Sequence, residues 1–391
     1  MNSSVIHKAG WVVIDPWTII NDGYIRVESG LIKETGKGSC SGHIIDHGHG
    51  ALLPVLVNAH THLELCALKD KVLPEKGFRN WVENLINLRN SAGTENLKTG
   101  AINGVKELIK SGCGVIGEIS TLGLTWKIVS NSRLRGVWFK EFFGNVLPEE
   151  ITCNLNKLLI IKSIAGHAPH TLSPELLVDL KNITRKENIP FSIHLAESED
   201  EIFFLTTGKG IWADFMTERG IDFSDWNLPV ETPVRYLEDL GILDEKTIAV
   251  HLIHADKKDF EILLRHNVRV CICLRSNFNL YNMMPDLAGM LKAGIKPCLG
   301  TDSVASAESL SIFDEMTFVS KSFTSIPPAE ILAMATVNGA SSLGFGEMFG
   351  SLTPGKRAAF VYVPVDVSSK SGLLQALVNA DFKGSCKTIL Q

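Results

Sequence analysis

The sequence lacks the features that mark a membrane protein or a secreted protein. None of its apolar runs approaches the roughly 20 residues that an α-helix needs to cross a bilayer. The N-terminal segment MNSSVIHKAGWVVIDP contains no apolar core of a signal peptide. The eight cysteines are scattered, and the closest pair, Cys271 and Cys273, has neither zinc-finger nor redox-motif spacing. We therefore expect a cytoplasmic protein whose thiols are reduced and mostly buried.

A strong charge of one sign is also missing. The chain carries 38 lysines and arginines against 43 aspartates and glutamates, for a net charge of -5, and no basic stripe stands out. Nucleic acids and anionic membranes are therefore not expected partners, which leaves a small molecule as the expected ligand. With 45% hydrophobic and 21% charged residues, the composition is that of an ordinary globular protein. Its 391 residues suit a large α/β barrel with an appended domain.

The two ends of the chain carry short strand-like runs. The N-terminal part contains the runs WVVID, GYIRVESG and HIIDHG, which are broken by Gly, Asn and Asp and are typical of hairpins. The tail contains another run, AAFVYVPV, at residues 358–365. Neither end is long enough to close a core of its own. We expect residues 1–52 and 353–391 to meet in one small β-sandwich beside a central domain of residues 53–352.

Between these ends, apolar strand-like runs alternate with helical patterns. The segments FRNWVENLINLRN (78–90) and SPELLVDLKNITRKEN (173–188) carry apolar residues at a spacing of three or four, which predicts helices. Strands that alternate with helices predict a parallel sheet, and eight such units predict a (β/α)8 TIM-type barrel with its site at the C-terminal ends of the strands. The predicted strands are residues 53–60, 114–120, 136–143, 159–168, 190–197, 247–254, 269–276 and 296–303.

Polar side chains gather where the predicted strands end. Buried parallel strands are otherwise rich in Val, Ile and Leu, so each polar end needs a reason. A single histidine at a strand end is more often a hydrogen-bonded core residue than a ligand, and this reading stays open for each histidine taken alone. The residues at or just beyond the strand ends are His60, His62, His167, His170, His194, Glu197, His251, His254, Arg275, Ser276, Asn277, Asp302 and Ser303.

Four of these side chains together predict a metal site. His60 and His62 lie at positions i and i+2 of one strand, so both point to the same face. A barrel brings the ends of its first, fifth and eighth strands to one pocket, which adds His194 and Asp302 to the pair. Three imidazoles and one carboxylate suit a single divalent ion, Zn²⁺ or Fe²⁺, with a position left for water.

Five motifs follow one another along the chain. They are VNAHTHLEL (57–65), HLAESEDE (194–201), AVHLIHADKKD (249–259), LRSNFNL (274–280) and LGTDSVAS (299–306). In this order they resemble the amidohydrolase superfamily, and within it the mononuclear-metal branch of cytosine, guanine and adenosine-type deaminases and triazine hydrolases. The likeness covers nearly the whole chain, including the sandwich expected from its two ends.

The resemblance implies a role for each matched residue. It makes the four converging side chains the metal ligands, Glu197 the proton shuttle, and His251 the histidine beside the water that the metal activates. Asp302 and His251 would accept the proton of that water. Glu197 would protonate a ring nitrogen of the substrate and later the leaving amine. The reaction implied is hydrolytic deamination with release of ammonia.

Other positions carry weaker expectations. Asn277 is expected to order the loop after the seventh strand, and His254 to be a structural histidine. Glu64 would either orient a ligand or cap its own loop. Lys162 lies at the start of the fourth strand, at the wrong end of the barrel, so a two-metal centre bridged by a carboxylated lysine is not expected.

The segment GHAPHTLSPELL resembles deaminases that act on adenosine derivatives. In that group the matching histidine, His167 here, contacts the nucleoside, and His170 stands where tyrosine is common. Ser303 is also expected to contact the substrate. Trp81, in the helix that follows the first strand, would stack on the purine or pack the lid over it. Glu83 would meet the ribose or remain in solvent.

The expected substrate is 6-amino-6-deoxyfutalosine, an intermediate of menaquinone synthesis. The patterns HLELCAL, FKEFFG and HLAESEDE look most like the deaminases of that compound, and FKEFFGN lacks an arginine that could hold the carboxylate of a homocysteine conjugate. The alternatives are deamination of methylthioadenosine, S-adenosylhomocysteine, guanine or cytosine, hydrolytic dechlorination, and a metal-binding barrel without catalysis. Relatives are often dimers, so a homodimer is one expectation.

Overall fold

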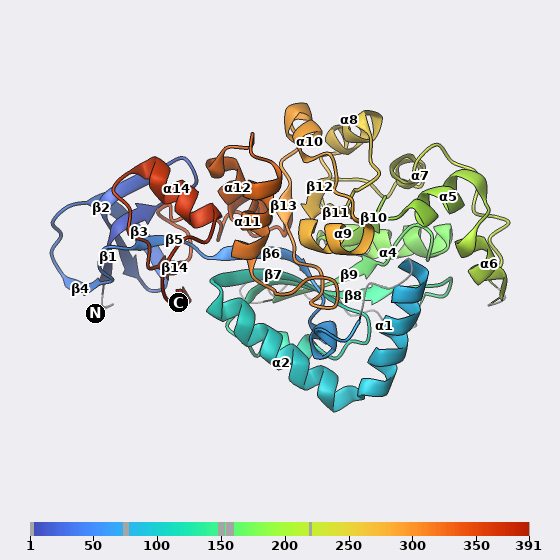
Figure 1. Cartoon of the computed structure of the whole chain (residues 1–391), viewed down its shortest axis with the longest axis horizontal. Coiled ribbons are helices and arrows are strands. Elements are labelled where there is room, and N and C mark those ends of the chain that lie inside the picture. The colour runs from blue at the N-terminus through green and yellow to red at the C-terminus, as the bar shows by residue number, and fades with distance from the viewer. Residues whose placement is uncertain (1–3, 73–77, 148–152, 154–159, 219–220, 391) are drawn as a thin grey trace.

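A sheet of eight parallel strands forms the centre of the computed structural model. The strands follow the order β13-β12-β11-β10-β9-β8-β7-β6, and a parallel bridge between Thr61 and Asp302 joins the two edges (Figure 1). The sheet therefore nearly closes into a barrel, and the predicted (β/α)8 barrel is confirmed. The structure describes residues 4–72, 78–147, 153, 160–218 and 221–390.

Each barrel strand overlaps one of the apolar runs predicted from the sequence, and β6, β7 and β8 each extend one residue beyond their run. The first run, 53–60, divides between two sheets, because its beginning belongs to β5 (Ala51–Pro54) of a second sheet. Leu159, the first residue of the fourth predicted run, lies outside the described residues. The barrel strands are β6 (Leu56–Thr61), β7 (Cys113–Ser120), β8 (Arg135–Phe142), β9 (Ile160–Gly166), β10 (Phe191–Leu195), β11 (Thr247–His251), β12 (Arg269–Ile272) and β13 (Cys298–Leu299).

The prediction for the end of the seventh run was wrong. Strand β12 ends at Ile272, and helix α9 (Leu274–Tyr281) begins two residues later, so the Arg-Ser-Asn segment forms the first turn of a helix. Arg275 is buried, and its Nε donates a hydrogen bond to Oε1 of Glu315 at 2.7 Å. This contact with α11 (Ile312–Ser322) fixes the start of α9 against its neighbour.

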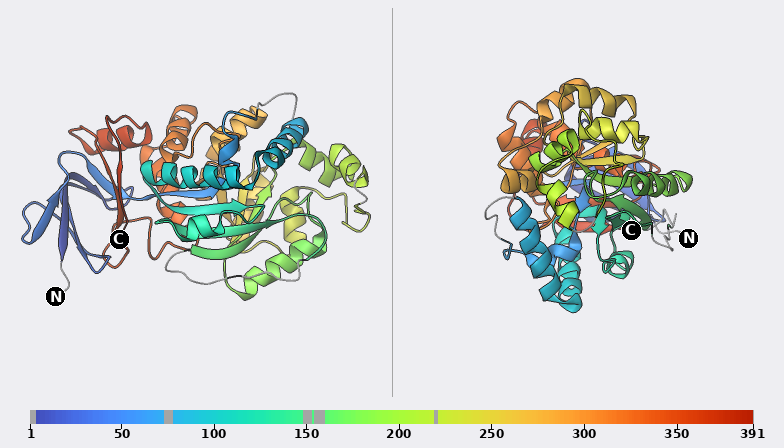
Figure 2. Two further views of the ribbon diagram at one scale, coloured as in Figure 1. Left: turned by 90° about the horizontal axis from the view of Figure 1, so that it is seen from below. Right: turned by 90° about the vertical axis from the view of Figure 1, so that its right-hand side faces the viewer.

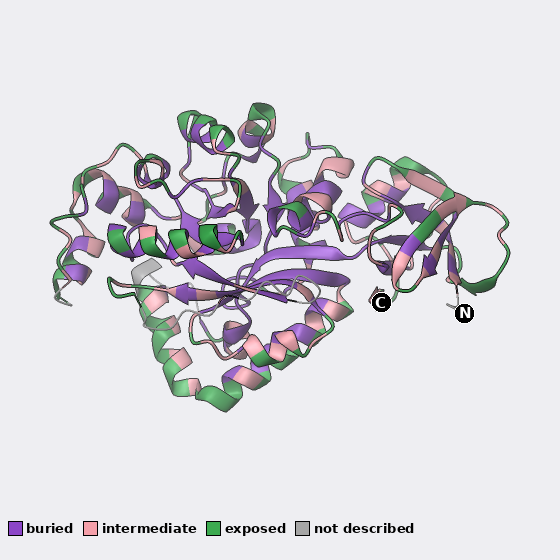
Figure 3. Cartoon of the chain, turned by 180° about the vertical axis from the view of Figure 1, so that it is seen from behind, coloured by how far each residue is buried: buried purple, intermediate pink, exposed green. Residues whose placement is uncertain are grey.

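Helices cover the outside of the barrel, whose strands are buried (Figure 3). Both predicted helices are present, and Ser173 caps the second one by accepting a hydrogen bond from the backbone N–H of Leu176. No helix in the described ranges is long and apolar enough to cross a membrane. The two predicted helices are α1 and α4. Besides α9 and α11, the described helices are η1 (Leu63–Leu68), α1 (Phe78–Ala92), α2 (Thr94–Lys110), α3 (Trp126–Ser130), α4 (Pro174–Lys186), α5 (Glu199–Thr207), α6 (Ile211–Glu218), α7 (Pro233–Asp239), α8 (Lys257–Arg265), α10 (Leu287–Ala293), α12 (Pro328–Met334), α13 (Val337–Ser342) and α14 (Lys370–Val378).

Both ends of the chain build the second sheet, which lies at one end of the molecule (Figure 2). Val12 and Ile25 from the N-terminal strands share a core with Leu52 and Phe360, so both ends of the chain contribute to one apolar cluster. The predicted domain limits stay a prediction: β5 straddles residue 52, and α14 packs against barrel helices α11 and α12. The strands of this sheet are β1 (Val5–Val13), β2 (Ile19–Glu28), β3 (Leu31–Lys37), β4 (His43–Asp46), β5, β14 (Ala359–Val363) and β15 (Lys387–Leu390).

Candidate active site

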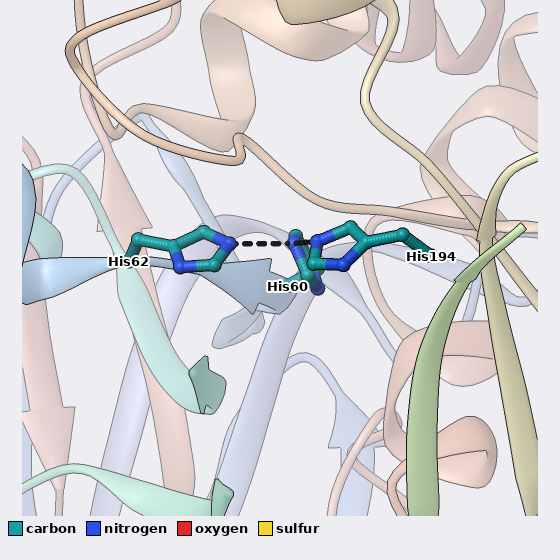
Figure 4. A group of neighbouring side chains, drawn as sticks. All are labelled: His60, His62 and His194. Carbon is teal, nitrogen blue, oxygen red and sulfur yellow. Dashed lines mark hydrogen bonds between the residues drawn. The ribbon is translucent and has the colours of Figure 1, made fainter. Parts of the chain in front are cut away.

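Three imidazoles meet at the C-terminal end of the barrel. His60 and His62 come from the end of β6, and His194 comes from β10 (Figure 4). The Nε2 atoms of His60 and His62 lie 3.1 Å apart, and those of His60 and His194 lie 3.3 Å apart. All three side chains are buried. The structure therefore brings together the three histidines that the sequence singled out.

Asp302, which follows β13, completes the group. Its Oδ1 lies 3.4 Å from Nε2 of His62 and 3.9 Å from Nε2 of His60. Its other oxygen, Oδ2, accepts hydrogen bonds from the hydroxyls of Ser276 at 2.6 Å and Ser306 at 3.0 Å. The two serines thus hold the carboxylate with Oδ1 facing the imidazoles.

This donor set fits a divalent metal ion. Ligand atoms about 2.0–2.1 Å from a tetrahedral zinc ion lie about 3.3 Å from one another, close to the separations between the imidazole nitrogens. Burial lowers the pKa of His60 well below its usual range and that of His62 to about 4, so both rings are neutral at pH 7. Neutral imidazole nitrogens and a carboxylate that converge on one point suit a cation between them.

A hydrogen bond sets the orientation of His194. Its Nδ1 donates to the backbone carbonyl of His167 at 2.7 Å, which leaves Nε2 unprotonated and facing the other histidines. Glu141, His167 and His194 form a second group with ligand atoms close to one another. Because Nδ1 of His194 already binds the carbonyl oxygen, we assign the metal position to the first group.

His251 lies beside this cluster at the end of β11. Its ring centroid is 5.9 Å from that of His60, and its Nδ1 donates to Oδ1 of Asn277 at 2.7 Å. This bond leaves the lone pair of Nε2 free on the cavity side. Asn277 was expected to order the loop after the seventh strand. It acts from the first turn of α9 and fixes the tautomer of His251.

Glu197 faces the same point from the segment after β10. Its Oε1 lies 3.6 Å from Nε2 of His251 and accepts a hydrogen bond from the hydroxyl of Tyr281 at 3.0 Å. Burial raises the pKa of Glu197 to about 7. A carboxyl group with this pKa can both give and take a proton near neutral pH.

The backbone at three of the strand ends adopts an unusual conformation. At one of them, the end of β10, a buried carboxyl group holds the turn. Ala196, His251 and Asp302 have positive φ angles of 51°, 77° and 55°, which non-glycine residues adopt rarely. Glu201 accepts hydrogen bonds from the backbone N–H groups of Ala196 at 2.9 Å and Glu197 at 2.8 Å. Its carboxylate therefore stabilises the turn that carries Glu197.

A cavity of about 470 Å³ opens over the cluster. The three residues predicted to contact substrate, Trp81, His167 and Ser303, all line it. Trp81 also packs in an apolar cluster with Leu68, so it closes one wall. His167 stacks on Phe143, with ring centroids 4.3 Å apart. All three side chains are therefore in a position to contact a substrate in the cavity. The contacts themselves stay a prediction.

The remaining predicted positions have structural surroundings. Glu64 accepts hydrogen bonds from the hydroxyl of Ser120 and from two backbone N–H groups, so it organises the loop after β7. Glu83 is exposed, and His254 is half-buried; neither lines the cavity. Lys162 lies against the rings of Trp126 and Trp138, at 5.5 and 5.6 Å from their centroids, and outside the cavity lining.

Three functional contacts were missed by reasoning from the sequence. Tyr281 reaches Glu197, Glu201 holds the turn beside it, and Ser306 binds Asp302. For Tyr281 a signal was present, since it lies four residues after Asn277 and thus on the same face of a helix. That signal required the Arg-Ser-Asn segment to be recognised as helical.

The comparisons with known proteins decide the family. The model of the amidohydrolase family matches residues 147–389. The chain belongs to the amidohydrolase family. It is therefore a hydrolase that acts on carbon–nitrogen bonds, as the resemblance of its motifs had implied.

Individual amidohydrolase relatives cover nearly the whole chain. The chain is 27% identical to the 5-methylthioadenosine/S-adenosylhomocysteine deaminase of Syntrophomonas wolfei, over 95% of this chain and 87% of that protein. The structure of Helicobacter pylori aminofutalosine deaminase with methylthio-coformycin has a TM-score of 0.84 at 22% identity, covering 98% and 99% of the two chains. A Xanthomonas campestris adenosine deaminase with bound zinc has a TM-score of 0.78 at 20% identity, covering 96% and 89%. The structural matches support the fold.

Replacing Asn277 tests how this amidohydrolase orients His251. We expect Asn277→Ala to retain its metal and to lower kcat/KM about 10- to 100-fold, because His251 loses the acceptor that fixes its tautomer. Asn277→Asp keeps an acceptor at the same position and should recover part of the rate. Metal analysis and steady-state kinetics of both variants provide the check. Equal losses in the two variants would contradict this role.

Replacing His170 tests a pH dependence of stability. This ring is buried against Trp212, and neither of its nitrogens has a hydrogen-bond partner in the described part of the chain. Burial lowers its pKa to about 3. The folded state therefore binds its proton only far below the unfolded pKa of about 6.5, so falling pH costs stability, amounting to about 2 kcal/mol at pH 5. His170→Phe removes this cost. We therefore compare the melting temperature of His170→Phe with that of the original protein at each pH. The variant should gain more over the original at pH 5 than at pH 7.5, and an equal difference at both pH values would contradict the expectation.

Proposed function

We propose that this protein is a metal-dependent deaminase that releases ammonia from an adenosine derivative by hydrolysis. The observation that carries the proposal is the convergence of three histidines and Asp302 in one cavity with Glu197 and His251. A site that only stored a metal would not need a half-buried carboxyl group with a pKa of about 7 beside the ligands.

In this proposal, His60, His62, His194 and Asp302 hold one divalent ion. The ion is zinc in the first instance and Fe²⁺ as the alternative, since imidazole and carboxylate ligands accept both. When bound, it would supply Lewis acidity and make a water molecule acidic enough to react at neutral pH.

His251 and Asp302 take the proton from the attacking water. Nδ1 of His251 keeps its proton on Asn277, so the lone pair of Nε2 accepts. Oδ1 of Asp302 faces the same position while Ser276 and Ser306 bind Oδ2. Both acceptors are therefore held before the substrate arrives, which lowers the reorganisation needed in the transition state.

Glu197 moves the second proton. In its protonated form it donates to a ring nitrogen of the substrate, which makes the adjacent carbon more electrophilic. The deprotonated Glu197 then takes up the proton that His251 and Asp302 received from the water and delivers it to the amino group, which leaves as ammonia. The proton of the newly added hydroxyl group restores the protonated form of Glu197 as the carbonyl forms. The hydrogen bond from Tyr281 fixes the position of this carboxyl group. Its pKa of about 7 allows both states at neutral pH.

The substrate that we propose is 6-amino-6-deoxyfutalosine, within the menaquinone pathway, with methylthioadenosine and S-adenosylhomocysteine as alternatives. The likeness to an aminofutalosine deaminase over almost the whole of both chains supports the first. The activity for which the Syntrophomonas relative is named supports the alternatives. Trp81, His167 and Ser303 would contact the nucleoside in either case.

A substrate panel tests the proposal. The protein is loaded with zinc, and ammonia release and the ultraviolet change from adenine to hypoxanthine are followed with 6-amino-6-deoxyfutalosine, methylthioadenosine, S-adenosylhomocysteine, guanine and cytosine. We expect the highest kcat/KM with an adenosine derivative. Stoichiometric metal with no ammonia from any compound would contradict the proposal and favour a metal-binding barrel without catalysis.

A further inference from the structure

An arginine lines the cavity on the wall formed by α1. Arg89 lies in the last turn of this helix, four residues after Leu85, and both side chains face the cavity that contains the histidine cluster. The Nε atom of Arg89 is buried and has no hydrogen-bond partner among the residues that the structure describes. Arg89 also forms no ion pair with any residue that the structure describes. The guanidinium group thus lies in this wall without an ion pair, although its charge acts on Glu141 in the same lining.

The surroundings of Arg89 are mainly apolar. A substituent that extends from the nucleoside into this part of the cavity would meet aromatic and aliphatic side chains from α1, from α6 and from the segment after β8. Such a lining binds apolar groups and excludes water, so a charge within it needs a partner. The apolar residues of the lining are Leu65, Trp81, Val82, Leu85, Ile86, Phe143, Trp212, Phe215, Met216, Ile221 and Leu280.

The charge of Arg89 acts on Glu141, a carboxyl group of the cavity lining, but Glu141 has other contacts. Its Oε2 accepts a hydrogen bond from the hydroxyl of Thr121 at 2.6 Å, and its Oε1 lies 3.9 Å from Nδ1 of His194. Glu141 also forms a close group with His167 and His194, so it belongs to the surroundings of the histidine cluster. A ligand is therefore the available source of a negative group for Arg89.

We propose that Arg89 is a specificity-determining residue that binds a negatively charged group at the end of an apolar substituent of the substrate. A planar guanidinium binds a carboxylate through paired, charge-assisted hydrogen bonds, and these are strongest where water is excluded. The segment FKEFFGN at the end of β8 lacks an arginine, and α1 thus supplies one. The inference rests on the proposed deaminase activity and narrows its substrate class.

The same wall disfavours an amino-acid zwitterion. The ammonium group of such a substituent would lie in apolar surroundings near the guanidinium group of Arg89. Glu141 could not easily serve as its partner, because it already accepts a hydrogen bond from the hydroxyl of Thr121. Removing an ammonium group from water without a partner is costly. An apolar monoanion therefore fits this cavity better than a homocysteine side chain, and better than a short neutral group that leaves Arg89 unpaired.

Two matched compounds test the inference. They are 5′-S-(3-carboxyphenyl)-5′-thioadenosine and 5′-S-phenyl-5′-thioadenosine, which differ in one carboxylate. We expect the zinc-loaded protein to deaminate the carboxylate compound with a kcat/KM about 10- to 100-fold higher, mainly through KM. In Arg89→Gln the ratio between the two compounds should fall to about 1, and Arg89→Lys should retain part of it.

A charge control separates local binding from general electrostatics. Lys98→Gln removes one positive charge from the neighbouring helix α2, outside the cavity lining. This variant should keep the original ratio. A preference that is absent in the original protein, or that survives in Arg89→Gln, would overturn the inference. Failure of the deaminase proposal is distinguishable, because neither compound would then release ammonia from any variant.

Discussion

Replacing Glu197 by glutamine is expected to lower turnover about 10²- to 10⁴-fold while the protein keeps one metal ion per chain. The amide has nearly the shape of the carboxyl group but cannot carry a proton to the ring nitrogen and then to the leaving amine. The hydrogen bond from Tyr281 can still be accepted by the amide oxygen, so the local structure is retained. Metal analysis and the rate of ammonia release, measured on the same sample, provide the test.

Glu199 offers a matched control for this substitution. It is exposed, it begins α5, and it lies two residues after Glu197. Glu199→Gln makes the same chemical change on the same segment and should leave turnover and metal content unchanged. Near-normal turnover in Glu197→Gln would show that the proton moves by another route, and loss of the metal would show that Glu197 serves the metal site instead.

Replacing His60 by alanine is expected to remove the metal first and the activity with it. Nε2 of His60 lies within 3.3 Å of the corresponding atoms of both other histidines, so this ring is central to the cluster. A site with three remaining ligands should lose the ion on dialysis, and ammonia release should fall to the background rate. His62→Ala should behave in the same way.

His254→Ala is the control for these two variants. It removes a histidine from the same end of the barrel, but this ring is half-buried and does not line the cavity. We expect full metal content in this variant. Circular dichroism of all three variants shows whether they are folded. Folded His60→Ala with stoichiometric metal and normal activity would contradict the assignment of the ligands.

Much of the barrel and of the histidine cluster could be predicted from the sequence because both depend on local periodicity. Each buried parallel strand gives a continuous apolar run, and polar residues at its end mark the functional edge of the barrel. His60 and His62 share a face because side chains alternate along a strand. The closed sheet then brings His194 and Asp302 to the same point.

Contacts that depend on side-chain geometry between distant segments could not be predicted. Tyr281 meets Glu197 across 84 positions of the sequence, and this contact exists only because α9 begins directly after β12. That helix start depends on the buried pair of Arg275 and Glu315. Arg89 likewise has the sequence context of an ordinary surface helix, and its place in the cavity wall follows from how α1 packs on the barrel.

The central claim, metal-dependent deamination of an adenosine derivative, is tested most directly by removing and restoring the metal. The protein is treated with a chelator, and zinc is then added in steps while bound metal and ammonia release from 6-amino-6-deoxyfutalosine and methylthioadenosine are measured together. We expect no release without metal, a rate that rises in proportion to bound zinc, and a plateau at one ion per chain. Full activity in the metal-free protein, or a fully loaded protein that releases no ammonia from either compound, would contradict the account.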